Sequence, residues 1–90
     1  MTSAEIIVTN SLGLHARAAA KLVRIAARYE SVIKLHRRNN SVFADAKSIL
    51  SVLTLAASCG SELTIECHGT DEIEALEQIV YLFESKFGEE

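Results

Sequence analysis

The sequence lacks the features that mark membrane and secreted proteins. No run approaches the roughly 20 consecutive apolar residues that a membrane-spanning helix requires. The first residues, Met1 to Glu5, are polar and contain neither a basic region nor the apolar core of a signal peptide. Proline and tryptophan are also absent, but their absence excludes few folds. We therefore expect a cytoplasmic protein without membrane insertion.

Cysteine is scarce, with Cys59 and Cys67 the only two in the chain. Without a secretory signal, two reduced thiols are favoured over a disulfide. The neighbouring pair Cys67 and His68, at its spacing from Cys59, matches no zinc-ligand pattern. We expect no metal site and no cofactor.

Charge is distributed unevenly along the chain. Residues 1–47 contain eight Lys and Arg against three Asp and Glu, a balance of +5. Residues 48–90 contain one Lys against nine Asp and Glu, a balance of −8, so the two halves sum to −3. This polarity favours a face that docks onto a charged partner. A nucleic acid is not the expected partner, because the net charge is negative and no aromatic residue is interleaved with the basic ones.

Residues 1–90 read as one domain, because 90 residues contain no linker, repeat or low-complexity run. Residue patterns predict strands over 5–9, 31–36, 41–44 and 63–67, with a turn at Asn39 and Asn40 joining the second and third. They predict helices over 16–28 and 47–57, the second capped by Ser48. A last helix is expected to be capped by Thr70 and to bury Ile73, Leu76, Val80, Phe83 and Phe87. The order β-α-β-β-α-β-α predicts an α+β open-faced sandwich, with three helices on one face of a four-stranded antiparallel sheet.

The most informative stretch is Ser11-Leu12-Gly13-Leu14-His15-Ala16-Arg17-Ala18. Gly13 gives the chain conformational freedom, and His15 then stands at the expected N-cap of the first helix. Free backbone N–H groups and the helix dipole make such a position a good phosphate site, and they disfavour a charged imidazole. Arg17 adds a planar donor fork that suits phosphate oxygens. A neutral histidine in this setting can attack a phosphoryl group.

The residues alone leave a plainer interpretation open, since a single histidine at a helix start is usually an ordinary surface residue. No Asp or second His lies nearby in the sequence to build a hydrolase triad. A basic stripe strengthens the functional interpretation, because it begins beside His15 and would attract acidic partners. Its members share one face of the first helix: Arg17, Lys21, Arg24 and Arg28.

The stretch around His15 resembles the active-site signature of the HPr family, the histidine-containing phosphocarriers of the bacterial phosphoenolpyruvate-dependent phosphotransferase system. Residues 46–53 resemble the family's second-helix segment, and residues 60–69 resemble its last strand. The likeness therefore covers essentially the whole chain. The family usually has proline where Ala18 stands, which suits a first helical turn but supplies no catalytic atom.

The resemblance implies a phosphoryl carrier rather than an enzyme with its own turnover. It implies that His15 is phosphorylated on Nδ1 by enzyme I and passes the group to an enzyme IIA, while Arg17 neutralises its charge. Ser48 matches the serine that an HPr kinase/phosphorylase modifies in many members. The helix-capping role of Ser48 is compatible with that modification.

The resemblance also implies a docking surface for the partner proteins. The expected docking residues lie on the first two helices: Ala20, Lys21, Arg24, Lys47, Ile49, Leu50 and Leu53. One or two of the three apolar residues in the second helix are expected to pack inward, with Leu50 and Leu53 the better candidates for exposure. A carrier with alternating partners is most simply a monomer.

Two other functions remain open at this point. Residues 8–10 and 82–87 resemble the nitrogen-branch variant of the family, a regulatory phosphocarrier without a role in sugar transport. A ligand-binding regulatory module on a similar scaffold is the alternative from another class, supported by the expected fold alone.

Overall fold

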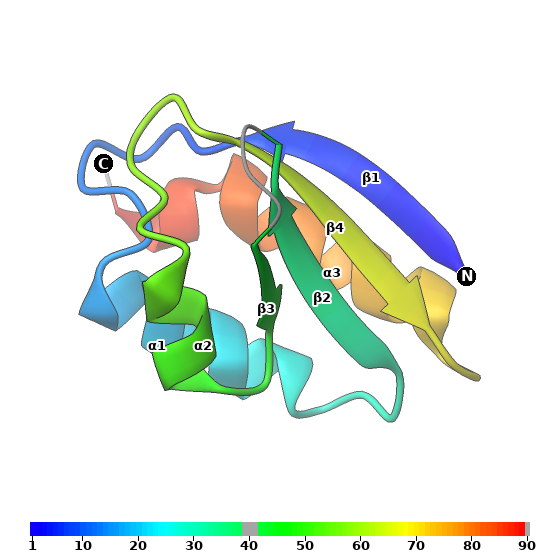
Figure 1. The fold of residues 1–90 in the computed structure, drawn as a ribbon. Coiled ribbons are helices and arrows are strands. Elements are labelled where there is room, and N and C mark those ends of the chain that lie inside the picture. The colour runs from blue at the N-terminus through cyan, green and yellow to red at the C-terminus, as the bar shows by residue number, and fades with distance from the viewer. Residues whose placement is uncertain (39–41, 90) are drawn as a thin grey trace.

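The computed structural model of the chain describes residues 1–38 and 42–89. Within them, four strands and three helices follow one another, and a short 3-10 helix (η1) follows α3 (Figure 1). In chain order the elements are β1 (Thr2–Ile7), α1 (Ala16–Ala26), β2 (Val32–Arg37), β3 (Phe43–Asp45), α2 (Ile49–Thr54), β4 (Glu62–His68), α3 (Glu72–Glu84) and η1 (Lys86–Gly88). The expected turn at Asn39 and Asn40 lies outside the described residues. No helix in the described ranges is long and apolar enough to cross a bilayer.

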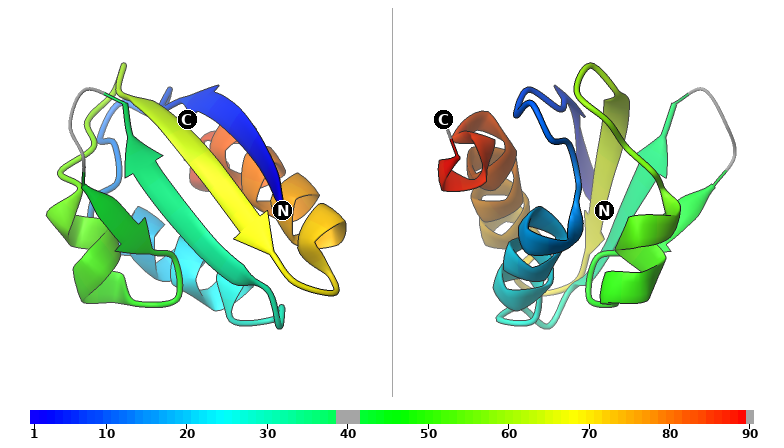
Figure 2. Two further views of the ribbon diagram at one scale, coloured as in Figure 1. Left: turned by 45° about the vertical axis from the view of Figure 1, so that its right-hand side comes forward. Right: turned by 90° about the vertical axis from the view of Figure 1, so that its left-hand side faces the viewer.

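The four strands form a single sheet in the order β1-β4-β2-β3, and each neighbouring pair is antiparallel. The helices lie on one face of the sheet and leave the other face open (Figure 2). The predicted α+β open-faced sandwich is therefore confirmed.

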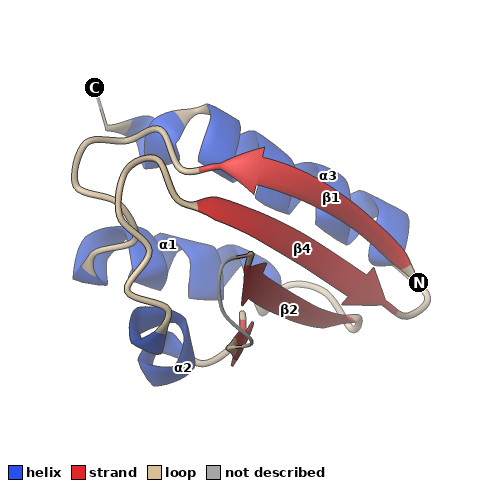
Figure 3. Ribbon diagram, turned by 45° about the horizontal axis from the view of Figure 1, so that its top comes forward, coloured by secondary structure: helices blue, strands red, loops and turns tan. Residues whose placement is uncertain are grey.

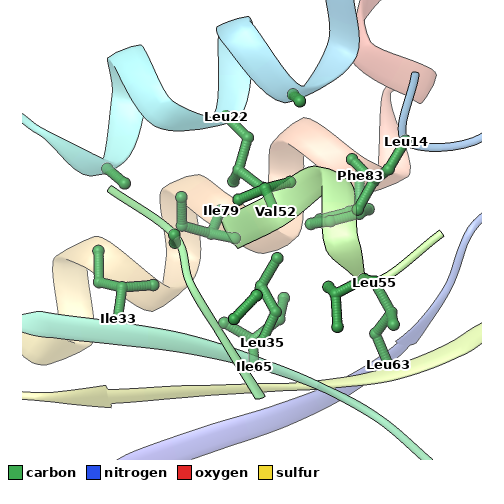
Figure 4. Packing of buried hydrophobic residues seen from close by; sticks show 14 of the residues in the cluster. Leu14, Leu22, Ile33, Leu35, Val52, Leu55, Leu63, Ile65, Ile79 and Phe83 are labelled. Atoms are coloured by element: carbon green, nitrogen blue, oxygen red, sulfur yellow. The ribbon is translucent and has the colours of Figure 1, made fainter. Parts of the chain in front are cut away.

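The core lies between the sheet and the helices (Figure 4). Alternate residues of a strand point to the same face, so one face of β2 and β4 supplies a continuous apolar surface. Burial of each large apolar side chain contributes about 1.5–3 kcal/mol to folding. The fully buried side chains that meet here are Ile33 and Leu35 of β2, Leu63 and Ile65 of β4, Leu22 of α1, Val52 of α2 and Ile79 of α3.

The first strand begins and ends earlier than its sequence pattern predicts. It runs from Thr2, paired with Cys67, to Ile7, paired with Glu62. Residues 5–9 were predicted as the strand because they include a run of β-branched side chains. The observed ends of the strand are instead set by its pairing with β4. Polar residues are accommodated in this edge strand because its side chains alternate between the core and the open face.

The last helix also differs from the prediction. Asp71, not Thr70, is its N-cap, and Ile73 is 68% exposed instead of buried. The fully buried positions are Ala75, Ile79 and Phe83, while Leu76 and Val80 are only partly buried. Phe87 is buried as predicted, but it lies in η1, after the helix has ended.

The second helix is shorter than the predicted 47–57, because it ends at Thr54 and Ala56 adopts a positive φ of 50°. Ser48 is its N-cap, as predicted, and its hydroxyl accepts a hydrogen bond from the Ser51 amide at 3.3 Å. The chain beyond α2 is thereby turned toward the loop that precedes α1.

Candidate functional site

The loop before α1 is fixed by close contact with the chain that follows α2. Gly13 has a φ of 66°, and a Cβ atom there would lie 2.5 Å from the carbonyl oxygen of Ala57. The next amide, that of Leu14, donates to the same oxygen at 2.8 Å. Gly13 is thus needed for a tight backbone approach, and the prediction that it loosens the chain is wrong.

His15 is the N-cap of α1, as predicted, and its backbone is extended. Its Nδ1 accepts a hydrogen bond from the Arg17 amide at 3.3 Å, and its Nε2 lies 2.8 Å from Oε2 of Glu89. The side chain of His15 is 24% exposed and that of Arg17 is 68% exposed. The structure therefore brings the two predicted residues together at an accessible helix N-terminus, where free amides and the helix dipole favour anions.

Two further residues complete the site, and neither was predicted from the sequence. Glu89 lies in the C-terminal segment, which returns to the loop before α1 (Figures 1 and 3). Asn10 is fully buried, and its Nδ2 donates to the Gly13 carbonyl at 2.8 Å and to Oε1 of Glu89 at 3.3 Å. The position of Asn10 directly before the signature stretch was a possible signal, but no local pattern links residue 89 to residue 15.

The Glu89 carboxylate is the acidic group of the site. Burial acts to raise its pKa, but the hydrogen bonds from His15 and Asn10 and the charge of Arg17 outweigh burial, so the pKa is lowered overall. An ionised carboxylate can only accept hydrogen bonds, so Nε2 of His15 is the donor in their contact. In the neutral ring, Nδ1 then carries the free electron pair.

The basic stripe on α1 is only partly free. Arg24 and Arg28 are exposed like Arg17, whereas Lys21 is half-buried and donates to the carbonyl oxygen of Phe87 at 2.6 Å. Ala20, the small residue expected in the docking surface, is also half-buried. The hydrogen bond from Lys21 therefore links the C-terminal segment to α1, and its ammonium group also adds positive charge near the site.

Helix α2 lies beside α1 (Figure 3). Before α2, the Lys47 ammonium group donates to the Tyr29 carbonyl, just beyond the C-terminal end of α1, at 2.6 Å. After α2, the Ala57 carbonyl accepts from the Leu14 amide, just before the N-terminal end of α1. Ser48 consequently lies toward the opposite end of α1 from His15. An 11-residue helix is about 16 Å long, so Ser48 is outside the immediate surroundings of the imidazole.

The apolar residues of α2 divide between surface and core. Leu50 is 74% exposed and Ile49 is 39% exposed. Leu53 is partly buried and packs against the core. The expected exposure of Leu50 is confirmed, but the preference for Leu53 over Ile49 is wrong, because Leu53 packs against the core and Ile49 is the second exposed side chain of the three. Leu12, in the loop before His15, is exposed as well.

The remaining histidines and cysteines lie elsewhere in the molecule. His36 stacks on Phe43 with ring centroids 4.3 Å apart, and His68 ends β4. Both cysteines are free thiols, as predicted, with Cys59 exposed and Cys67 buried. Burial raises the pKa of the Cys67 thiol to about 11, so it is a poor nucleophile at neutral pH.

Comparison with known proteins identifies relatives along nearly the whole chain. Residues 2–85 match a family model described as the PTS HPr component phosphorylation site. The phosphocarrier protein HPr of Cupriavidus necator is 44% identical over 89 residues, covering 99% of this chain and 98% of the relative. The phosphocarrier protein NPr of Proteus mirabilis is 40% identical over 85 residues, covering 94% of this chain and 93% of the relative.

Solved structures give the same result. HPr-C-His from Thermoanaerobacter tengcongensis matches with a TM-score of 0.93 and 40% identity, covering 100% of this chain and 99% of that one. The structure of an HPr dimer from the same organism matches with a TM-score of 0.78 and 38% identity, covering 99% of this chain and 100% of that one. These matches favour a phosphocarrier over a ligand-binding module on the same scaffold. The chain belongs to the HPr family of phosphocarriers of the phosphotransferase system.

Proposed function

We propose that the chain carries a phosphoryl group on Nδ1 of His15, which it receives from enzyme I and passes to an enzyme IIA. The observation that carries this proposal is the placement of His15, whose Nδ1 accepts from the Arg17 amide in the first turn of α1 while its Nε2 contacts a carboxylate. A phosphoryl group on Nδ1 would accept hydrogen bonds from the amides of this turn and from the exposed Arg17 guanidinium.

The transfer needs no proton removal at Nδ1. The Nδ1 electron pair forms the new bond to phosphorus, the bond between phosphorus and the donor atom breaks, and its electron pair leaves with the donor. Transfer to the acceptor repeats these changes with the chain as donor. Because the site lies at the surface, both partners can reach His15, and the chain acts as a carrier in the cytoplasm rather than as an enzyme with its own turnover.

The proposal is tested by mass spectrometry after incubation with phosphoenolpyruvate, Mg²⁺ and the cognate enzyme I. The wild-type chain is expected to gain one acid-labile phosphoryl group, and His15→Ala is expected to gain none. Transfer of the group to an added IIA protein would establish the second half of the relay. Retention of the phosphoryl group in His15→Ala would exclude His15 as the acceptor.

The partner surface proposed here combines the exposed apolar residues of α2 with the cations of α1. Leu50 and Ile49 supply apolar area, and Arg24 supplies an exposed charge. Leu53 and Ala20 contribute at the junction between the helices, while Lys21 and Lys47 contribute charge from ammonium groups already bound to carbonyls. Each partner covers this surface in turn, so we propose that the working form is a monomer.

Ser48 is proposed as a second, regulatory phosphorylation site for an HPr kinase/phosphorylase. Its hydroxyl caps α2 and the residue is half-buried, with the exposed Leu50 two positions away. A phosphate there would add about two negative charges to the partner surface without touching His15. The test is incubation with such a kinase and ATP, for which wild type but not Ser48→Ala is expected to gain an acid-stable phosphate.

The nitrogen branch remains a second candidate pathway, because an NPr is among the relatives with 40% identity. The two branches differ in the accepting protein. Phosphorylated chain offered equal amounts of a sugar-specific IIA and a nitrogen-branch IIA is expected to discharge faster to its own partner. The ratio of the two transfer rates assigns the branch.

A further inference from the structure

The carboxylate of Glu89 contacts three side chains of the candidate site. One oxygen lies 2.8 Å from Nε2 of His15 and 3.5 Å from Nε of Arg17. The other accepts from Nδ2 of Asn10 at 3.3 Å. The side chain of Glu89 is only 15% exposed. These contacts and this burial hold the carboxylate in place.

The backbone before Glu89 shows how the carboxylate is held. Phe87 is buried and packs edge-on against Phe83, with ring centroids 4.9 Å apart. Its carbonyl accepts from Lys21 at 2.6 Å. Lys86, Phe87 and Gly88 have successive φ values of 57°, 58° and 74°, a left-handed conformation that is unfavourable for the two non-glycine residues. Tertiary contacts therefore hold a tight reversal that directs residue 89 toward α1.

Asn10 joins this C-terminal segment to the loop of His15. It is fully buried, and its amide nitrogen serves both the Gly13 carbonyl and the Glu89 carboxylate. The positions of the carboxylate and of the loop are thus coupled through one side chain. A rotation of the His15 ring away from Glu89 would cost the charge-assisted hydrogen bond at Nε2.

We propose that Glu89 is a positioning residue for His15, whose carboxylate keeps the proton on Nε2 and leaves Nδ1 as the nucleophile at the helix N-terminus. This inference rests on the proposed function, and it adds a residue to which neither the signature stretch nor the family match gives a role. The Arg17 amide supports it independently, since an N–H that donates to Nδ1 requires that nitrogen to be unprotonated.

The carboxylate also assists the transfer itself. When Nδ1 bonds to phosphorus, positive charge develops on the ring, and the nearby negative charge at Nε2 stabilises it. The Nε2 proton stays in place throughout, and no other proton has to move. On discharge to the acceptor the bond from Nδ1 to phosphorus breaks, and its electron pair returns to Nδ1.

Full-length Glu89→Ala and Glu89→Gln chains with ¹⁵N-labelled histidine test this assignment, with Glu84→Gln as the matched control on the exposed side of α3. In the wild type, ring ¹⁵N shifts at a pH where the ring is neutral are expected to show Nε2 protonated. Glu89→Ala is expected to move the two ring resonances toward each other as the tautomers mix. Its phosphorylation by enzyme I is expected to slow about tenfold, the effect of losing one charge-assisted hydrogen bond. Glu89→Gln retains a hydrogen-bond acceptor but has no charge, so its ring shifts and its phosphorylation rate should lie between those of the wild type and Glu89→Ala.

Unchanged ring shifts and an unchanged rate in Glu89→Ala would overturn the inference while the proposed function stands. Faster phosphorylation of Glu89→Ala would overturn it too, because Glu89 would then obstruct the site. If Glu84→Gln changed the rate and the ring shifts as much as Glu89→Gln does, the effect would come from the loss of a negative charge in general. That result would also reject a specific role for Glu89. If the proposed function fails, no variant takes up phosphoryl, and the ring shifts by themselves decide whether Glu89 holds the Nε2 proton.

Discussion

The segments before and after α1 are each held by a carboxylate from the C-terminal part of the chain, but the two carboxylates bind different kinds of group. At the far end, Asp71 accepts from the amides of Glu30 and Ser31 at 2.9 and 3.0 Å, and from the Ser31 hydroxyl. At the near end, Glu89 contacts the side chains of His15, Arg17 and Asn10.

This difference separates a structural from a functional use of the same chemical group. Backbone amides must be satisfied wherever a loop is packed, so the contacts of Asp71 close the turn after α1. In the role proposed for Glu89, its contacts instead fix the Nε2 proton and the direction of the His15 ring. Substitutions at the two ends should therefore divide into those that change folding and those that change phosphoryl transfer.

The largest effect is expected from Gly13→Ala, which disturbs folding and the site together. The new Cβ would meet the Ala57 oxygen at 2.5 Å in a residue with positive φ. Urea denaturation should show a loss of about 2–4 kcal/mol in the free energy of unfolding. Gly60→Ala is the control, because its Cβ meets no atom within 4 Å and only backbone strain opposes it. Equal losses in the two variants would show that the close approach at Gly13 is unimportant.

Arg17→Gln should affect phosphoryl transfer with little effect on folding. The side chain is 68% exposed, so its loss leaves no cavity, but the phosphoryl group loses a charged donor. Phosphorylation by enzyme I is expected to slow about 10- to 100-fold, the effect of losing a hydrogen bond to a charged group, while the thermal midpoint stays close to that of wild type. Arg28→Gln, at an exposed position beyond the end of α1, is the control and should phosphorylate at nearly the wild-type rate. Similar rates for both variants would remove the special role of Arg17.

Ser48→Ala should affect folding alone, because it removes the cap of α2 and lies away from His15. The lost hydrogen bond to the Ser51 amide is expected to cost about 1 kcal/mol in the free energy of unfolding. Uptake of phosphoryl at His15 by the unmodified variant should remain within about twofold of wild type, the scatter expected of a surface substitution. A large fall in uptake would place Ser48 in the transfer step itself.

The smallest effect concerns the acid sensitivity of the far end of α1. Hydrogen bonding from the Ser31 hydroxyl, and then from the Glu30 amide, lowers the pKa of Asp71. A lowered folded-state pKa contributes stability that is present above the ordinary aspartate pKa of about 3.9 and is lost as pH falls toward the folded value. Asp71→Asn should therefore reduce the difference in thermal midpoint between pH 6 and pH 3. An unchanged difference would contradict a stabilising ionised Asp71.

Local patterns predicted the parts of this fold that depend on neighbouring residues. The inward set Leu63, Ile65 and Cys67 follows strand alternation, and all three are fully buried. His15 and Ser48 were placed as N-caps because capping depends on the residues directly at a helix start. The start of α1 at Ala16 was likewise predicted correctly.

Features set by packing between distant segments could not be predicted in this way. Ile73 fits helical spacing but lies in the first turn of α3, outside the buried face. Glu89 reaches His15 only because Phe87 is buried after a left-handed reversal. The predicted half of the site, His15 and Arg17, lies within one helical turn, whereas Asn10 and Glu89 are connected to it by the folded chain.

The most direct test of the central claim is the heteronuclear NMR spectrum of the phosphorylated chain with ¹⁵N-labelled histidine. The predicted result is coupling between ³¹P and Nδ1 of His15, with Nε2 still protonated and the rings of His36 and His68 unchanged. Coupling to Nε2 of His15, or to a ring nitrogen of another histidine, would contradict the account.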